Sequence, residues 1–218
     1  MKPKPIKTTE KKPRRGRPSD SKKGDFRQQI LDSAEQAFAH SSFDSVSLKD
    51  IASPVGVTPA MIHYYFGSKQ VLLQSVVEQA LEPVATAIQS QKLQQDANIE
   101  EFVAQLYATM QRHPNLPLLF FRQVLLPGGP MQEHFLQQLA PRLGGALPGL
   151  ISRGQEAGRI AKELDPSIAA LMVLSLCIFP LVSRPLSEPA LGMKFDTDGM
   201  TALQQHVIRF IQRGLQTP

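Results

Sequence analysis

The residues from Thr58 to Lys69 combine hydroxyl, imidazole and ammonium groups, with which proteins hydrogen-bond to phosphate. Thr58-Pro59 has the form of an N-cap followed by a proline at the first helical position. The spacing therefore predicts a helix from about Pro59 to Phe66, which Gly67 ends. Because the amino end of a helix attracts phosphate oxygens, this segment is a candidate nucleic-acid contact.

A second short helix is expected directly before this one. Ser47-Leu48-Lys49-Asp50 has the form of a capping box, Pro54 should end the helix early, and Gly56 permits a tight turn. Two short helices joined by such a turn form a helix-turn-helix, whose second helix enters the major groove of DNA with its amino end first. The residues expected nearest the base edges are Pro59, Ala60 and Met61, and Thr58 can offer its hydroxyl to a phosphate.

The carboxyl end of the expected recognition helix is rich in aromatic residues. His63, Tyr64 and Tyr65 lie where one or two of them can reach phosphates, and Lys69 adds a cation near the DNA backbone. We expect Phe66 to be core. For the two tyrosines the sequence leaves packing and phosphate contact open, since an aromatic ring can be buried while its hydroxyl reaches out. The lone His63 is expected to be exposed rather than bound to a metal.

The amino-terminal 23 residues form a basic arm. They hold ten Lys and Arg against two acidic residues, a net +8, whereas the remaining residues sum to −3 and the whole chain to +5. Such an arm is expected to be disordered alone and to bind a polyanion. Within it, Arg14-Arg15-Gly16-Arg17-Pro18 resembles an AT-hook core, which fits the narrow minor groove of A·T-rich DNA. The alternative is a polybasic tail that only raises affinity and salt sensitivity.

The rest of the chain also has helical periodicity, with no strand alternation and no internal repeat. We therefore expect an all-α fold. The expected helices run from Asp25 to about His40, from Ser68 past a kink or break at Pro83, from Asn98 to His113, from Asn115 to Leu126, over one or two segments of 131–159, from Asp165 to Ser183, and from Thr197 to Gly214. Residues 184–196 are expected to form a loop.

Residues 25–73 resemble the DNA-binding domain of the TetR/AcrR family of transcriptional regulators. The matching elements are Ile30-Leu31-Asp32-Ser33-Ala34, Phe38, Asp50-Ile51-Ala52, Gly56-Val57-Thr58 and the run from Met61 to Lys69. The resemblance implies that Thr58, Ala60, Met61, His63, Tyr64, Tyr65 and Lys69 occupy DNA-contact positions, and we add Pro59, Ser47, Arg14, Arg15 and Arg17. His63 stands where the family often has tyrosine, so a phosphate bond there would be weaker or pH dependent.

The resemblance further implies a homodimer whose other helices form a ligand pocket and a dimer interface. We expect a basic arm (1–23), a helix-turn-helix domain (24–70) and a helical body for ligand binding and dimerisation (71–218). The expected function is a repressor that binds a palindromic double-stranded operator and is released by a small, largely apolar effector. The two helices expected at the dimer interface are Pro166–Ser183, which is apolar nearly all round, and Thr197–Gly214.

Apolar residues of the body could line the ligand pocket, although each alone is equally suited to ordinary core. The candidates are Phe102, Leu106, Met110, Phe120, Phe121, Phe135, Met172 and Leu176, with Phe179 beside them and Arg122, Gln123 or His134 as a polar partner. The proline- and glycine-broken stretch from Pro141 to Gly149 should leave space that regular bundles lack.

Other function classes find little support. The sequence has no phosphate-binding glycine loop, no metal-spaced His/Cys set and no Gly-x-Ser-x-Gly elbow, so we expect no enzyme, no catalytic residue, no metal and no cofactor. The single Cys177 fits a reducing compartment, and no segment looks like a secretory signal or a membrane span, so we expect a cytoplasmic protein with no membrane partner. An architectural DNA binder driven by the arm, and a small-molecule binding or enzymatic body with a vestigial DNA domain, remain the alternatives.

Overall fold

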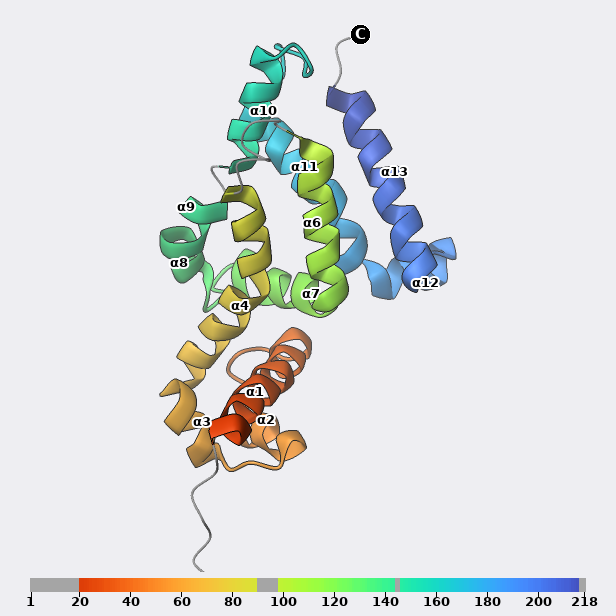
Figure 1. The fold of residues 1–218 in the computed structure, drawn as a ribbon. Helices are drawn as coiled ribbons and strands as arrows, with labels where there is room; N and C mark the ends of the chain where they lie inside the picture. The colour runs from red at the N-terminus through yellow and green to blue at the C-terminus, as the bar shows by residue number, and fades with distance from the viewer. Residues whose placement is uncertain (1–19, 90–97, 144–145, 216–218) are drawn as a thin grey trace, which may run out of the picture.

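The computed structural model describes residues 20–89, 98–143 and 146–215, which fold into helices with short connections. No strand occurs among these residues, so the predicted all-α class is confirmed. Figure 1 shows three helices grouped at one end of the molecule, a long helix leading away from them, and a larger helical body at the other end.

The three-helix group consists of α1 (Asp20–His40), α2 (Leu48–Val55) and α3 (Pro59–Phe66). The bounds of α3 are as predicted, whereas α1 begins five residues before the expected start at Asp25. The group closes on fully buried side chains from all three helices, Ile30, Ala34, Phe38, Ile51 and Ile62. This small core fixes α3 against its neighbours, so that the opposite side of α3 faces outward.

The capping box of α2 forms as predicted, but the expectation that Pro54 ends this helix early was wrong. Ser47 Oγ accepts a hydrogen bond from the Asp50 amide, and the Asp50 carboxylate accepts one from the Ser47 amide. Pro54 lies inside the helix, which continues to Val55. Proline is tolerated there because it removes only one donor from a last turn that the amides of Gly56 and Val57 already close. Gly56 then supplies the left-handed turn, with φ 71°.

The long helix α4 (Lys69–Gln89) leads from the three-helix group into the body. Ser68 caps it as predicted, because its hydroxyl oxygen accepts the Val71 amide at 3.1 Å. Pro83 lies within α4 and does not divide it. One continuous element therefore joins the candidate DNA contact to the body.

The body contains the remaining helices. They are α6 (Ile99–Arg112), α7 (Leu116–Phe120), the π-helical turn η1 (Phe121–Leu125), α8 (Gln132–His134), the π-helical turn η2 (Phe135–Leu139), α9 (Ala140–Leu143), α10 (Ala146–Glu156), α11 (Pro166–Val182), α12 (Arg184–Leu191) and α13 (Thr197–Leu215). The side chains of Asn98 and Asp165 cap α6 and α11, the helices expected to start at these residues.

The expectation of a loop over residues 184–196 was wrong in its first part, because α12 occupies Arg184–Leu191. This helix contains two prolines, Pro185 and Pro189. Pro185 stands in the first turn, where a missing amide hydrogen leaves no bond unmade, and Gly192 ends the helix with φ 66°. No single helix among the described residues meets the length and apolarity of a membrane span; by those measures alone the bent pair α11 and α12, at 73°, would pass together.

Candidate functional site

The outward side of α3 presents most of the residues predicted to contact DNA. Thr58, Pro59, Ala60, His63 and Tyr64 are exposed, and Met61 is half-buried. Thr58 is the N-cap with extended backbone, and its side chain makes no capping hydrogen bond. Its hydroxyl is therefore not committed to the helix end and can be offered to a phosphate.

The aromatic end of α3 divides between surface and core. Tyr64 is 70% exposed, whereas Phe66 is buried as predicted, with the Arg27 guanidinium 5.2 Å from the centre of its ring. Tyr65 is half-buried and meets the Tyr64 ring edge-on at 5.3 Å. The structure thus gives Tyr64 the freedom to reach a ligand and gives Tyr65 a mixed role. His63 is exposed, and its Nδ1 lies 2.9 Å from the Gly67 carbonyl oxygen, which holds the ring beside the end of the helix.

Lys69, which was predicted to contact the DNA backbone, also makes several contacts within the protein. Its ammonium donates to the carbonyl oxygens of Phe43 (2.8 Å) and Val46 (3.0 Å) and lies 4.3 Å from the centre of the Phe43 ring. Lys69 therefore anchors the connection between α1 and α2 to the start of α4. A phosphate contact by its third N–H stays a prediction.

The remaining predicted DNA contacts are placed differently. Ser47 is exposed, and its hydroxyl is committed to Asp50, with Oγ donating to the carboxylate at 2.6 Å. The hydrogen bonds that the Ser47 hydroxyl and amide donate to the Asp50 carboxylate lower the pKa of Asp50 below its ordinary value. Arg14, Arg15 and Arg17 lie outside the described residues, so the minor-groove prediction stays untested.

The body contains an apolar cavity of about 270 Å³ that is partly open to solvent. Its wall is made of apolar side chains from α4, α6, α7, α9, α10, α11 and the two π-helical turns: Leu81, Val84, Phe102, Leu106, Met110, Leu116, Pro117, Phe120, Leu125, Phe135, Leu143, Leu147, Pro148, Ala170, Leu174 and Ile178. Five of the predicted ligand residues, Phe102, Leu106, Met110, Phe120 and Phe135, meet there. The contribution of Leu143, Leu147 and Pro148 agrees with the expected space in the Pro141–Gly149 stretch.

Three predicted ligand residues do not line this cavity. Phe121, Met172 and Leu176 are exposed, as is Phe179. Because α11 is apolar nearly all round, its sequence could not tell which face turns inward. The cavity face of α11 is Ala170, Leu174 and Ile178, and the other face lies open. The sequence reading also missed Leu81 and Val84 of α4, which continue the apolar spacing of that helix.

The predicted polar partners are also outside the cavity wall. Gln123 is buried in η1 and donates its side-chain amide to the carbonyl oxygens of Phe38 (2.7 Å) and Ser41 (3.2 Å). His134 pairs with Glu78, and Arg122 is exposed. Two of these three side chains therefore link the body to the helices that carry or adjoin α3.

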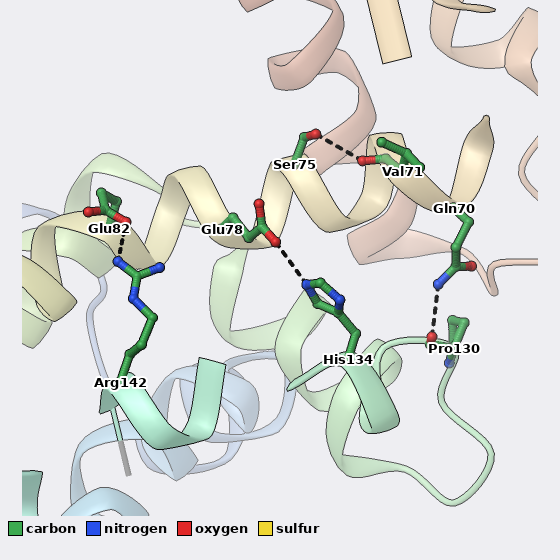
Figure 2. A network of polar contacts seen from close by, with 8 residues as sticks. All are labelled: Gln70, Val71, Ser75, Glu78, Glu82, Pro130, His134 and Arg142. Carbon is green, nitrogen blue, oxygen red and sulfur yellow. Dashed lines mark hydrogen bonds and ion pairs between the residues drawn. The ribbon is translucent and has the colours of Figure 1, made fainter. Parts of the chain in front are cut away.

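Polar side chains spaced along α4 contact the body, as Figure 2 shows. Gln70 donates to the Pro130 carbonyl oxygen at 2.9 Å, Glu78 pairs with His134 at 2.8 Å, and Glu82 pairs with Arg142 at 2.8 Å. A further pair, His113 with Glu35 at 2.8 Å, joins the end of α6 to α1. Polar contacts thus link the body to both α1 and α4.

Family models match both parts of the chain. The model of bacterial regulatory proteins of the tetR family matches residues 30–76, and that of the tetracyclin repressor-like C-terminal domain matches residues 96–211, more than half of the chain. The chain belongs to the TetR family. It is accordingly a DNA-binding transcriptional regulator of the helix-turn-helix type.

Several named proteins and solved structures are similar to this chain. The HTH-type transcriptional repressor NicS of Pseudomonas putida is 28% identical over 157 residues, which is 70% of this chain and 74% of NicS. The regulator BetI of Agrobacterium fabrum is 38% identical over 55 residues, 25% of this chain and 27% of BetI. The solved structure of the fatty acid degradation regulator FadR from Bacillus halodurans has a TM-score of 0.64 at 20% identity, covering 88% of this chain and 97% of that one.

Proposed function

We propose that this TetR-family chain is a homodimeric repressor that binds a palindromic operator and leaves it when a small, largely apolar ligand enters the body. The relatives support repression, since NicS is named a transcriptional repressor and NalD of Pseudomonas aeruginosa, similar in fold, is named a secondary repressor. The proposed parts are an arm (1–23), a DNA-binding domain (24–70) and a ligand-binding and dimerisation body (71–218).

The observation that carries the proposal is the course of α4. Its first residue, Lys69, anchors the α1–α2 connection beside α3, and its later residues Leu81 and Val84 are part of the cavity wall. A ligand that fills the cavity therefore presses on the helix that positions α3. A ligand can shift the protein between two shapes only by binding one of them better, and we propose that the cavity walled by α4 differs between the two shapes.

Dimerisation is supported by an apolar surface on the body. Ile168, Leu171, Met172, Leu176 and Phe179 are all exposed on α11, and Phe210 is exposed on α13. A contiguous apolar patch of this kind usually marks a protein interface. A second copy placed here would give two α3 helices, which must lie about 34–36 Å apart to enter successive major grooves on one side of DNA.

Fluorescence anisotropy with the DNA upstream of the chain's own gene tests this function. We expect sequence-selective binding that Tyr64→Ala weakens at least tenfold, because Tyr64 is exposed on the contact face and outside the core. Lys162→Ala, at an exposed site in the body, is the matched control and should bind normally. Equal, weak binding to every DNA sequence would overturn the proposal.

Removal of residues 1–19, the part of the basic arm that precedes α1, distinguishes a helix-turn-helix reader from an architectural protein that binds DNA through its arm. A helix-turn-helix reader should keep its sequence preference with weaker affinity and a shallower salt dependence. An arm-driven binder would lose binding and preference together. We assign no enzymatic step to the chain and place it in the cytoplasm with the DNA that it reads.

A further inference from the structure

A second cavity, of about 260 Å³, adjoins the apolar one and is open to solvent, since its polar residues Gln111, Arg184, Asp196 and Thr197 are all exposed. Unlike the first, it is polar along part of its wall, where Gln111, Arg184, Asp196 and Thr197 meet apolar neighbours. It lies where the end of α6 meets the α11–α12 junction and the start of α13. No residue predicted from the sequence for ligand binding lies in its wall except Met110.

Met110 and Pro117 belong to the walls of both cavities. Both are buried, so they stand between the two spaces rather than at an outer rim. Methionine is unbranched and has three rotatable bonds, which lets it change position at small cost. The side chain of Met110 lies between an apolar space and a polar one.

The polar wall of the second cavity offers both hydrogen-bond donors and hydrogen-bond acceptors. Arg184 uses Nε on Glu188 (3.2 Å) and stacks on the Phe195 ring at 5.3 Å, and no hydrogen bond is found for its two terminal nitrogens within the described chain. The Asp196 carboxylate accepts the Gly199 amide at 2.8 Å and has further acceptor capacity. One cation and one anion thus line the cavity, with Gln111 and Thr197 able both to donate and to accept.

We propose that the two cavities form one bipartite site for an uncharged amphipathic ligand, with an apolar body in the first cavity and an amide-type head in the second. A head that both donates and accepts hydrogen bonds satisfies Arg184 and Asp196 together. A carboxylate can pair with Arg184 but then lies near Asp196, and an ammonium can pair with Asp196 but then lies near Arg184, so each charged head gains one opposite charge and meets one like charge. This inference rests on the proposed ligand response and adds the chemical class of the ligand.

The chain has no tryptophan, so Phe120→Trp provides a single fluorescent reporter in the wall of the apolar cavity. Octanamide, octanoate and octylammonium share one apolar chain and differ in the head, and toluene fits the apolar part without any head. We expect octanamide to bind about tenfold tighter than either charged analogue, the effect of one charge-assisted hydrogen bond. Calorimetry on the unaltered chain repeats the series without the reporter.

Arg184→Gln should weaken octanamide about tenfold and leave toluene unchanged, because only the head contact is lost. Arg122→Gln is the matched control, since Arg122 is exposed and outside both walls. Ala170→Leu places a larger side chain in the apolar cavity and should weaken all four probes. Equal affinity for the three heads, or no effect of Arg184→Gln, would overturn the bipartite site.

The outcomes also separate this inference from the proposed function. Release of operator DNA by toluene with no head preference would leave the repressor proposal standing and overturn the bipartite site. Failure of every probe to bind the folded chain would overturn the bipartite site as well, while sequence-selective DNA binding would still be judged by anisotropy.

Discussion

The side-chain amide of Gln123 donates a hydrogen bond of 2.7 Å to the backbone carbonyl oxygen of Phe38. Gln123 lies in the π-helical turn η1 of the body, and Phe38 lies in the last turn of α1, where its ring is fully buried. A second bond from the same amide reaches Ser41. One buried side chain therefore completes the hydrogen bonding at the end of a helix in the DNA-binding group. Short π-helical turns often occur at functional sites, and here the turn supplies this contact.

Gln123→Leu should lower the free energy of unfolding by about 1–3 kcal/mol, because it leaves the buried Phe38 carbonyl oxygen without its donor. Chemical denaturation measures this loss. Gln138→Leu, at an exposed position of η2, is the control and should change stability little. A Gln123→Leu protein as stable as the unaltered chain would contradict the structural role of the amide.

Lys69→Met should destabilise the protein by about 1–3 kcal/mol, since the carbonyl oxygens of Phe43 and Val46 lose a charged donor. DNA affinity should fall with it, because the same ammonium fixes the connection beside α3. Lys49→Met, at an exposed site of α2, serves as the control for the loss of one positive charge. If Lys69→Met weakened DNA binding with stability unchanged, direct phosphate contact would be its main role.

Leu171→Glu should shift the chain from dimer to monomer. Leu171 is 66% exposed on the open face of α11, so a carboxylate there costs the isolated protomer little but would be buried without a partner in an interface. Sedimentation at several concentrations measures the shift. Glu163→Gln, an exposed charge change just before α11, should leave the association unaltered. A dimer that tolerated Leu171→Glu would place the interface elsewhere.

Features of a helix that are set by residues in its own turns could be predicted from the sequence, and features set by neighbouring helices could not. The bounds of α3 follow from Thr58, Pro59 and Gly67, which act on their own turns, so they were predicted correctly. The inward face of α11 depends on its neighbours, because the helix is apolar nearly all round. Met172 and Leu176 were therefore assigned to the cavity, although Leu174 and Ile178 line it.

Contacts between distant segments left no signal in the sequence at all. Gln123 and Phe38 are 85 positions apart, and nothing in either segment marks the pair. The second cavity was missed for the same reason, since Arg184 was placed in a loop and its partners in the cavity wall come from other helices.

Tyr107→Phe should raise the free energy of unfolding by about 1 kcal/mol. The substitution removes a hydroxyl that loses its hydrogen bonds to water on burial and gains none within the protein. The Tyr107 side chain is 1% exposed, and its hydroxyl has no hydrogen-bond partner within the described chain. Burial raises the pKa of this hydroxyl above its ordinary value, since the charged form would be still more costly. Thermal denaturation of the variant measures the gain. Tyr64→Phe, at an exposed ring, should leave the melting temperature unchanged, and a destabilised Tyr107→Phe would contradict the argument.

Cys177 should make the protein less stable in alkaline solution. Burial raises the pKa of its thiol to about 12, whereas an ordinary thiol in the unfolded chain titrates near 9.0. Below the unfolded value both states hold the proton and the thiol contributes no pH dependence. As pH rises above that value the unfolded thiol ionises first, so the free energy of unfolding falls at up to about 1.4 kcal/mol per pH unit.

Denaturation curves of the unaltered chain and of Cys177→Ala across this alkaline range isolate the contribution, because the other titrating groups are common to both. The slope should be shallower in Cys177→Ala. The same burial predicts that a thiol reagent labels the folded chain only as fast as the body opens, since Cys177 is 1% exposed and its thiolate is suppressed. Equal slopes together with rapid labelling of the folded protein would mean that Cys177 is accessible in solution, and that its face of α11 is not buried within the body.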